Sequence, residues 1–415
     1  MLYKSKRWVT ATVPITVLMC MLTSILFAQP RNDKRLDKLL RKHAPATLLN
    51  VLNNPEAYQF QIIYTRINRD KDNKPQFKYY HLNTDPNRYF YPASTVKLPT
   101  TLVALEKLNR LKINGLDKNS VMLTDSSYAG QTSVLKDTSS QNGLPSIAHY
   151  IKKIFLVSDN DAFNRLYEFV GQKHLNETLI SKGYSQTRIL KRLVPATEEE
   201  NKRTNPIRFY SDGKLVYQQK EQISDLQFDF SRKVELASGF YRGKTLVNEP
   251  MDFTRHNRFP LEEQQQILQS LMLPESTAKK KFELNKDDYT FLYKYMSMPP
   301  SKSEYPRYDS TAFPDNYVKF FWSEGTKSKI PDHIKIFNKA GLAYGFLIDN
   351  AYVIDSKNDV EYMIAAVIYT NKDGILNDDK YDYDEIGFPF FKEIGDIIYK
   401  HELKRKRKYE PDFTK

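Results

Sequence analysis

Cysteine is almost absent from this sequence, because Cys20 is the only one in 415 residues. A single cysteine excludes an internal disulfide and a zinc site built from several thiolates. The seven histidines do not fall into a recognisable ligand motif, so we expect neither a metal nor an organic cofactor.

Acidic residues are absent from the first thirty positions. Three basic residues there precede an uncharged, mostly apolar run over residues 8–28, which is the layout of a secretory signal peptide over residues 1–28. We expect cleavage after Ala28, which leaves residues 29–415 as one exported domain in the periplasm or cell envelope of a bacterium. The run is also long enough to stay in the bilayer as an N-terminal anchor, so both alternatives stay open.

The charge of the chain is unbalanced toward basic residues, with a formal net charge of +13. A basic surface favours anionic partners such as cell-wall polymers, lipid headgroups or nucleic acid. The charges are spread along the chain apart from one run at residues 404–408, which we interpret as a solvated C-terminal tail. We therefore expect no nucleic-acid partner, and contact with a membrane only through an uncleaved N-terminus.

Strand patterns lie at both ends of the chain and helical patterns lie between them. The expected strands cover residues 59–65, 77–82, 335–339, 347–354 and 362–369, and the expected helices cover residues 32–42, 94–111, 147–157, 161–170, 261–273 and 383–401. This order predicts an α+β fold in which an antiparallel sheet is built from both chain ends, with flanking helices and an inserted helical lobe.

Residues 205–335 show the weakest pattern. A hairpin is expected around Asp212-Gly213, and the Ser-, Tyr- and Pro-rich stretch after Pro299-Pro300 predicts an exposed loop.

Ser94 and Lys97 stand three positions apart at the start of an expected helix. Residues three apart share a helix face, so the Ser94 hydroxyl should lie beside the Lys97 amine. A lysine whose pKa is lowered by burial accepts the proton of a serine, which makes that serine a nucleophile. The helix N-terminus also offers backbone N–H groups to a developing oxyanion.

The Ser-x-x-Lys spacing is weak by itself, because it recurs at Ser133, Ser211 and Ser276. Of the four serines, only Ser94 is followed first by an apolar amphipathic helix and then by a second motif. This context selects Ser94 as the candidate nucleophile.

The second motif, Ser158-Asp159-Asn160, occurs once and follows the expected helix over residues 147–157. All three residue types favour helix caps and turns, which gives a purely structural interpretation. In the functional interpretation, Ser158 passes a proton between Lys97 and a leaving nitrogen. Asn160 then binds an amide of the substrate, while Asp159 orders the loop.

The third motif, Lys339-Ala340-Gly341, falls on an expected strand. One interpretation is a strand lysine beside two small residues. In the other, Lys339 attracts a substrate carboxylate and Gly341 lets the substrate backbone come close. The backbone N–H groups of Leu342 and Ser94 then form an oxyanion hole.

The order of these motifs is the signature of class A β-lactamases and penicillin-binding proteins, and the chain resembles this superfamily of serine hydrolases. The resemblance covers residues 40–205 and 330–400. It implies a β-lactamase/transpeptidase-like fold, catalytic roles for Ser94, Lys97 and Ser158, and no cofactor. The implied substrate is a small molecule, either a β-lactam or a peptidoglycan-derived compound.

The chain departs from the family pattern where class A enzymes carry Arg-x-Glu-Pro, whose glutamate activates the deacylating water. Here Val194 stands in the glutamate's place and cannot act as a base. Glu198, Glu199 and Glu200 follow closely. Either one of them replaces the missing base in a reshaped loop, or the three form a solvated acidic run.

Two further departures concern substrate binding. Ala340 stands where the family usually has Thr or Ser, and the lost charge-assisted hydrogen bond costs about 1.5–3 kcal/mol in binding a carboxylate. The interval between the second and third motifs is also longer than the family's. We expect an enlarged insertion within residues 205–335 that either reshapes the cleft wall or binds a partner.

These departures leave three functions open. The first is a serine β-lactamase-like hydrolase that forms an acyl-enzyme at Ser94 with β-lactams or related amides and esters. The second is a D,D-peptidase or esterase acting on peptidoglycan, since such relatives do without the class A glutamate. The third is a slow-turnover penicillin-binding sensor, because acylation without a deacylating base leaves a long-lived adduct. An inactive scaffold is disfavoured because the serine, both lysines and Asn160 are present.

Overall fold

The computed structural model describes residues 31–128, 130–277, 280–322 and 329–413. The predicted signal peptide or anchor, with Cys20, lies outside the described residues. Within the described ranges, no helix combines the length and the apolar character needed to cross a membrane.

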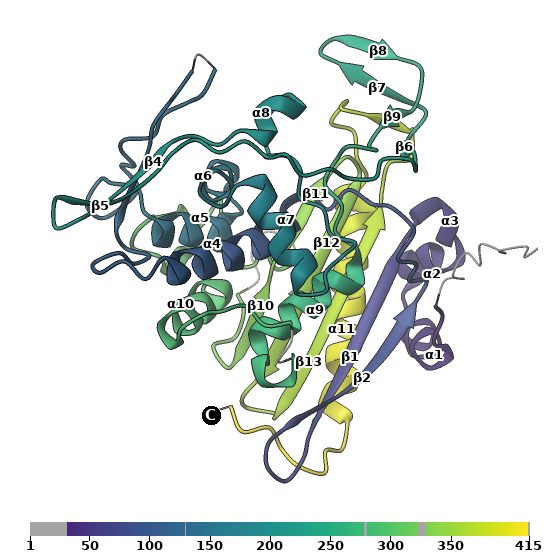
Figure 1. Ribbon diagram of the computed structural model, residues 1–415. Helices are drawn as coiled ribbons and strands as arrows, with labels where there is room; N and C mark the ends of the chain where they lie inside the picture. The colour runs from purple at the N-terminus through teal and green to yellow at the C-terminus, as the bar shows by residue number, and fades with distance from the viewer. Residues whose placement is uncertain (1–30, 129, 278–279, 323–328, 414–415) are drawn as a thin grey trace, which may run out of the picture.

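An antiparallel sheet forms the centre of the molecule and takes strands from both ends of the chain (Figure 1). Its order is β10-β12-β13-β1-β2, and β11 also pairs with β12. The strands are β1 (Gln61–Arg69), β2 (Pro75–Leu82), β10 (Ile334–Asn338), β11 (Gly341–Ala343), β12 (Phe346–Asp355) and β13 (Val360–Tyr369). Ile62 of β1 lies opposite Ala366 of β13, which joins the two ends of the chain. The prediction of such a sheet is confirmed.

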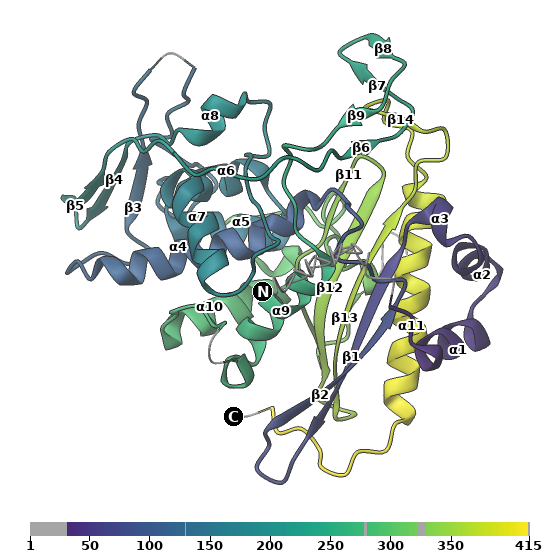
Figure 2. The same cartoon turned by 45° about the vertical axis from the view of Figure 1, so that its right-hand side comes forward.

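Alternate residues of this sheet pack into different parts of the core, as the two-residue period of a strand requires. Ile62 and Ala366 pack with the terminal helices, whereas Ile63 and Val367 pack on the other face. The terminal helices are α1 (Lys34–His43), α2 (Ala46–Asn53), α3 (Pro55–Tyr58) and α11 (Phe388–Lys404), the last preceded by a π-helical turn over Tyr383–Gly387. Figure 2 shows these helices on one side of the sheet and the helical lobe on the other.

The inserted lobe is built around α4, which contacts α5, α6 and α7 and is buried along most of its length. The lobe contains α4 (Lys97–Leu111), α5 (Ile147–Val157), α6 (Asn160–Val170), α7 (Gln172–Ser181) and α8 (Glu198–Lys202), together with a small sheet of β3 (Val121–Thr124), β4 (Ile207–Ser211) and β5 (Lys214–Gln219). The expected helices over residues 94–111, 147–157 and 161–170 are confirmed, and α7 was not predicted.

The region over residues 205–335 contains more regular structure than its sequence indicates. The expected hairpin (β4 and β5) and helix over residues 261–273 are present. The expected helix is α9 (Leu261–Met272). The elements that the sequence did not predict are β6 (Glu235–Leu236), β7 (Gly239–Arg242), β8 (Thr245–Val247), β9 (Met251–Asp252), α10 (Lys286–Ser297), and the 3-10 turns η2 (Pro274–Thr277), η3 (Pro300–Lys302) and η4 (Phe320–Trp322). A short strand from outside this region, β14 (Ile375–Leu376), pairs with β7.

The exposed loop expected after Pro299-Pro300 is only partly exposed. Pro300 is buried, and the stretch ends in η4, where Phe320 and Phe321 are buried. The ring centroids of Phe321 and Phe391 of α11 lie 5.1 Å apart. Apolar side chains therefore draw the end of this stretch into the core beside α11.

The sequence predicts that Lys339 and Ala340 lie within a strand. In the structure these two residues instead interrupt the strand. Asn338 of β10 pairs with Ala351 of β12, and Gly341 of β11 pairs with Ile348 in the same register. β10 and β11 are thus two halves of one edge strand, with the third motif at the break.

Candidate active site

Ser94 and Lys97 lie at the junction of a 3-10 turn, η1 (Ala93–Val96), with α4. The Lys97 Nζ atom donates a hydrogen bond to Ser94 Oγ over 2.8 Å, and the Lys97 side chain is fully buried. Ala93, just before the serine, has a φ of +48°. Left-handed backbone costs a non-glycine residue about 1–2 kcal/mol, and such strained residues cluster at active sites.

The second motif forms the turn between α5 and α6. Ser158 ends α5 in a left-handed conformation with φ 60°, and Asp159 caps α6 by accepting a hydrogen bond from Ala162 N at 2.8 Å. This turn directs its polar groups at Lys97, whose Nζ lies 3.2 Å from Ser158 Oγ and 2.7 Å from Asn160 Oδ1 and also bonds the Ser158 carbonyl. The capping interpretation is confirmed for Asp159, while the roles of Ser158 and Asn160 in catalysis stay predictions.

The third motif brings Lys339 to Ser158. Lys339 Nζ donates to Ser158 Oγ over 2.8 Å and to the Ala340 carbonyl over 2.6 Å. A Cβ atom on Gly341 would come within 2.6 Å of Ser94 N, so only glycine fits where the edge strand passes the nucleophile. Leu342 follows with 43% of its surface exposed.

The electrostatics of the site favour a neutral amine beside the nucleophile. Burial lowers the pKa of Lys97 well below its ordinary value, and the nearby Lys339 lowers it further. Burial also lowers the pKa of Lys339 to about 7. A neutral Lys97 amine within hydrogen-bond distance of Ser94 Oγ is positioned to accept its proton.

A buried polar network lies next to Lys339 and includes its sequence neighbour Asn338. The sequence analysis did not predict this network. Lys319 Nζ donates to Asn338 Oδ1 at 2.5 Å, and Asn338 Nδ2 donates to Asp349 Oδ1 at 2.8 Å. Burial lowers the pKa of Lys319 and raises that of Asp349. A lysine inside the apolar run of residues 318–322 was the available signal, since lysine is almost never fully buried unless paired.

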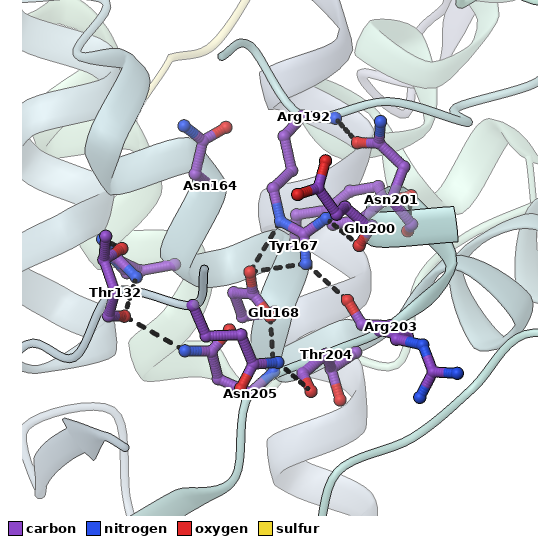
Figure 3. A network of polar contacts seen from close by, with 12 residues as sticks. Thr132, Asn164, Tyr167, Glu168, Arg192, Glu200, Asn201, Arg203, Thr204 and Asn205 are labelled. Atoms are coloured by element: carbon purple, nitrogen blue, oxygen red, sulfur yellow. Dashed lines mark hydrogen bonds and ion pairs between the residues drawn. The ribbon is translucent and has the colours of Figure 1, made fainter. Parts of the chain in front are cut away.

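The loop that carries Val194 is tied to α6 by Arg192 (Figure 3). The Arg192 guanidinium donates to Glu168 Oε1 over 2.6 Å and to the carbonyl of Glu200 over 2.7 Å, while Leu193 N donates to Asn164 Oδ1 over 2.9 Å. Val194 is 49% exposed and faces a cavity that it shares with Ser94. A valine thus stands at the rim of the cleft.

The structure does not bring the three glutamates to Ser94. Glu198 pairs with Arg255 at 3.0 Å, and Glu199 pairs with Lys202 at 2.7 Å. Glu200 closes a capping box with Thr197 at the start of α8. Among the described residues that line the cavities beside Ser94, none of these three occurs, so they serve the helix end and its surface.

Two cavities meet at Ser94, and both are also lined by Asn160 and Leu342. One, here called the relay arm, contains Ser158 and has a volume of about 710 Å³. The other, here called the loop arm, contains residues 191–196 and has a volume of about 690 Å³. The cleft therefore extends to both sides of the nucleophile.

The loop arm has an aromatic wall that the sequence analysis did not find. The rings of Tyr91 and Tyr344 line this arm and meet edge to face with centroids 4.9 Å apart. His256 also lines it, and its ring centroid lies 4.6 Å from that of the buried Phe253. Burial lowers the pKa of His256 to about 4, so this ring is neutral at physiological pH. In the part of the chain that the structure describes, no group of three or more His, Cys, Asp or Glu side chains is placed to hold a metal ion.

The pH dependence of labelling by a carboxylate-bearing β-lactam should follow Lys339. This lysine is protonated below its pKa of about 7 and loses its attraction for a carboxylate above it. We expect the second-order rate constant for acylation by benzylpenicillin, divided by that for an uncharged ester, to fall between pH 6 and 8.5, by at most about tenfold per pH unit. Stopped-flow acylation across this range measures it, and a flat ratio would contradict the role of Lys339.

Part of the sequence matches a known protein family. The model of the beta-lactamase enzyme family matches residues 47–225, somewhat less than half of the chain. No curated protein matches the sequence.

Several solved structures are similar. The beta-lactamase from Sphaerobacter thermophilus DSM 20745 is 12% identical with a TM-score of 0.46, over 86% of this chain and 97% of that one. PBP-A is 13% identical with a TM-score of 0.48, over 91% and 100%. A beta lactamase from Xanthomonas campestris pv. campestris str. ATCC 33913 is 14% identical with a TM-score of 0.48, over 88% and 98%.

Proposed function

We propose that this chain, of which residues 47–225 match the model of the beta-lactamase enzyme family, is a serine hydrolase of the β-lactamase/transpeptidase-like superfamily that forms an acyl-enzyme at Ser94 and releases β-lactam-derived acyl groups slowly. Export to the bacterial envelope, through the apolar segment over residues 8–28, is part of this proposal. The expected substrates are β-lactams and related amides or esters.

One observation carries the proposal. A continuous chain of polar contacts runs from Ser94 Oγ to Lys97 Nζ (2.8 Å), from there to Ser158 Oγ (3.2 Å), and on to Lys339 Nζ (2.8 Å). It joins residues from three distant parts of the sequence. Such a chain provides both the base that activates a nucleophile and a route for its proton.

The chemistry follows from this geometry. Ser94 Oγ attacks the carbonyl carbon of the substrate while its proton passes to the neutral Lys97 amine. The backbone N–H groups of Ser94 and Leu342 stabilise the oxyanion. When the tetrahedral intermediate collapses, Lys97 returns the proton through Ser158 Oγ to the leaving atom, and the acyl group stays on Ser94.

Deacylation needs a base for the attacking water, and the cleft lacks the class A glutamate. Val194 occupies its place, and the nearest acidic residues of the loop are engaged in capping and surface ion pairs. This favours the slow-turnover penicillin-binding and D,D-peptidase or esterase functions over an efficient β-lactamase.

Intact-mass measurement over time tests the proposed function. The protein is mixed with benzylpenicillin and sampled from seconds to hours. We expect a mass increase equal to that of the ligand that persists after free penicillin is removed. An adduct that disappears within seconds, while hydrolysed penicillin accumulates, would contradict slow release.

A glutamate at position 194 should speed deacylation. In Val194→Glu the loop remains tied by Arg192, so the new carboxylate lies at the cleft rim and can activate water. We expect the rate constant for loss of the penicilloyl adduct to rise by about 10²–10⁴-fold, the usual range for general-base catalysis. Val194→Gln is the control of similar size without a base, and equal rates for the two variants would contradict the prediction.

A further inference from the structure

The relay arm is mainly apolar, and parts of the chain outside the three motifs supply one of its walls. The end of the insertion contributes Pro314, Tyr317 and Val318, and the start of α11 contributes Phe388 and Pro389. Two segments far apart in sequence therefore make one apolar wall beside Ser94. A cavity of about 710 Å³ is within the range of small-molecule binding sites.

The position of Ser158 shows which half of a substrate enters this arm. Ser158 lines the relay arm but not the loop arm, whereas Ser94 lines both. Under the proposed function, on which this inference rests, Ser158 passes the proton to the departing atom. The leaving group must therefore lie in the relay arm and the acyl group in the loop arm.

The charges around the relay arm disfavour an anionic leaving group. Among the described residues that line it, the charged ones are Asp384, Glu393 and Lys392, and Lys392 Nζ pairs with Asp396 at 2.7 Å. Two carboxylates thus face this space together with one lysine that is already paired. A substrate carboxylate entering here meets like charge, which costs binding.

Near neutral pH, Lys339 offsets this repulsion only in part, and Ala340, which stands where the family has a hydroxyl, does not offset it. Lys339 is only 3% exposed, and its Nζ atom is already bonded to Ser158 Oγ and to the Ala340 carbonyl. Burial also lowers its pKa to about 7, so its charge is partial at neutral pH. Ala340 offers no hydroxyl.

We propose that this enzyme prefers substrates with a bulky, apolar and uncharged leaving group, an alcohol or amine that occupies the relay arm, over substrates such as benzylpenicillin, whose departing amine carries a carboxylate. In the ester case, Ser94 Oγ forms a bond to the carbonyl carbon and the bond from that carbon to the alkoxy oxygen breaks. The proton of Ser94 reaches the departing oxygen through Lys97 and Ser158. Water then hydrolyses the acyl-enzyme to the free acid.

A pair of esters that differ only in the leaving group tests this. 2-Naphthyl acetate releases an uncharged naphthol, and 6-carboxy-2-naphthyl acetate releases the same ring with a carboxylate. We expect kcat/KM for the uncharged ester to be higher by about tenfold or more. Hydrolysis by Ser94→Ala gives the background that is subtracted.

Two variants link the preference to the relay arm. Tyr317 is 42% exposed at the wall of this arm, so Tyr317→Lys adds a positive charge there without opening the core. We expect Tyr317→Lys to lower the ratio of kcat/KM for the uncharged ester to kcat/KM for the carboxylated ester at least threefold. Leu215→Lys is the matched control, since Leu215 is exposed on β5 outside both arms, and it should leave the ratio unchanged.

The outcomes separate this inference from the function on which it rests. Equal rates, a preference for the carboxylated ester, or a ratio insensitive to Tyr317→Lys would overturn the apolar leaving group. So would failure to hydrolyse either ester while benzylpenicillin still acylates Ser94. If neither ester nor benzylpenicillin acylates the protein, the proposed function fails as well.

Discussion

A Ser94→Ala variant is expected to lose all covalent labelling by benzylpenicillin and to lose turnover of any substrate by on the order of 10⁴-fold or more. Among the described residues that line both arms, namely Ser94, Asn160 and Leu342, Ser94 alone carries a hydroxyl that can form the acyl bond. Its removal also leaves Lys97 without the atom from which it takes a proton. Fluorescent-penicillin labelling, resolved by gel and by mass, measures this loss.

The control for this variant is Ser133→Ala. Ser133 has the same spacing to a lysine but is exposed, and it is absent from the described lining of both arms. It should label as the unmodified protein does. Labelling of Ser94→Ala at an undiminished rate would remove Ser94 from the role of nucleophile.

Replacing Lys97 with alanine should slow acylation by about 10²–10⁴-fold, the usual contribution of a general base. The reason is geometric and electrostatic together. The amine lies 2.8 Å from Ser94 Oγ, and burial lowers its pKa well below the ordinary value, which favours the neutral amine that accepts a proton. Stopped-flow mixing with a fluorescent penicillin gives the acylation rate constant.

The Lys97→Arg variant keeps a positive charge at this position but removes the base. Arginine stays protonated in proteins and cannot accept the proton of Ser94, so this variant should be slow as well. Thermal unfolding of each variant verifies folding, because the lost amine also leaves Ser158 O and Asn160 Oδ1 without a donor. Unchanged acylation in either folded variant would mean that another base activates Ser94.

The parts of the site that follow from local sequence could be predicted. Ser94 and Lys97 meet because they are one helical turn apart, and Ser158 and Asn160 belong to one turn between helices. The strands at the two chain ends were recognisable from their β-branched and aromatic residues. Their pairing into one sheet follows from the need to bury both faces.

The parts that depend on long-range contacts could not be predicted. No local pattern shows that residues 314–320 reach the cleft, because their place depends on packing against α11. The break at Lys339 depends on the register of both halves with β12. Lys319 and Asp349 lie 30 positions apart and are linked by hydrogen bonds through Asn338, which stands in a different part of the sequence pattern from either of them.

One signal was present in the sequence and was not used. Thr197 and Glu200 stand three positions apart, which is the spacing of a capping box. Both reciprocal hydrogen bonds of that box are present in the structure. The acidic run after Val194 is therefore explained by the start of α8, and a carboxylate that caps a helix is held away from the cleft.

The most direct test of the account is to locate the acyl group. The protein is incubated with benzylpenicillin, quenched in acid, digested and analysed by tandem mass spectrometry. We predict one penicilloyl group, on the hydroxyl of Ser94, still present after the free drug has been removed. A penicilloyl group on another serine, or on a lysine or tyrosine, would contradict the assignment of Ser94 as the nucleophile and with it the proposed mechanism.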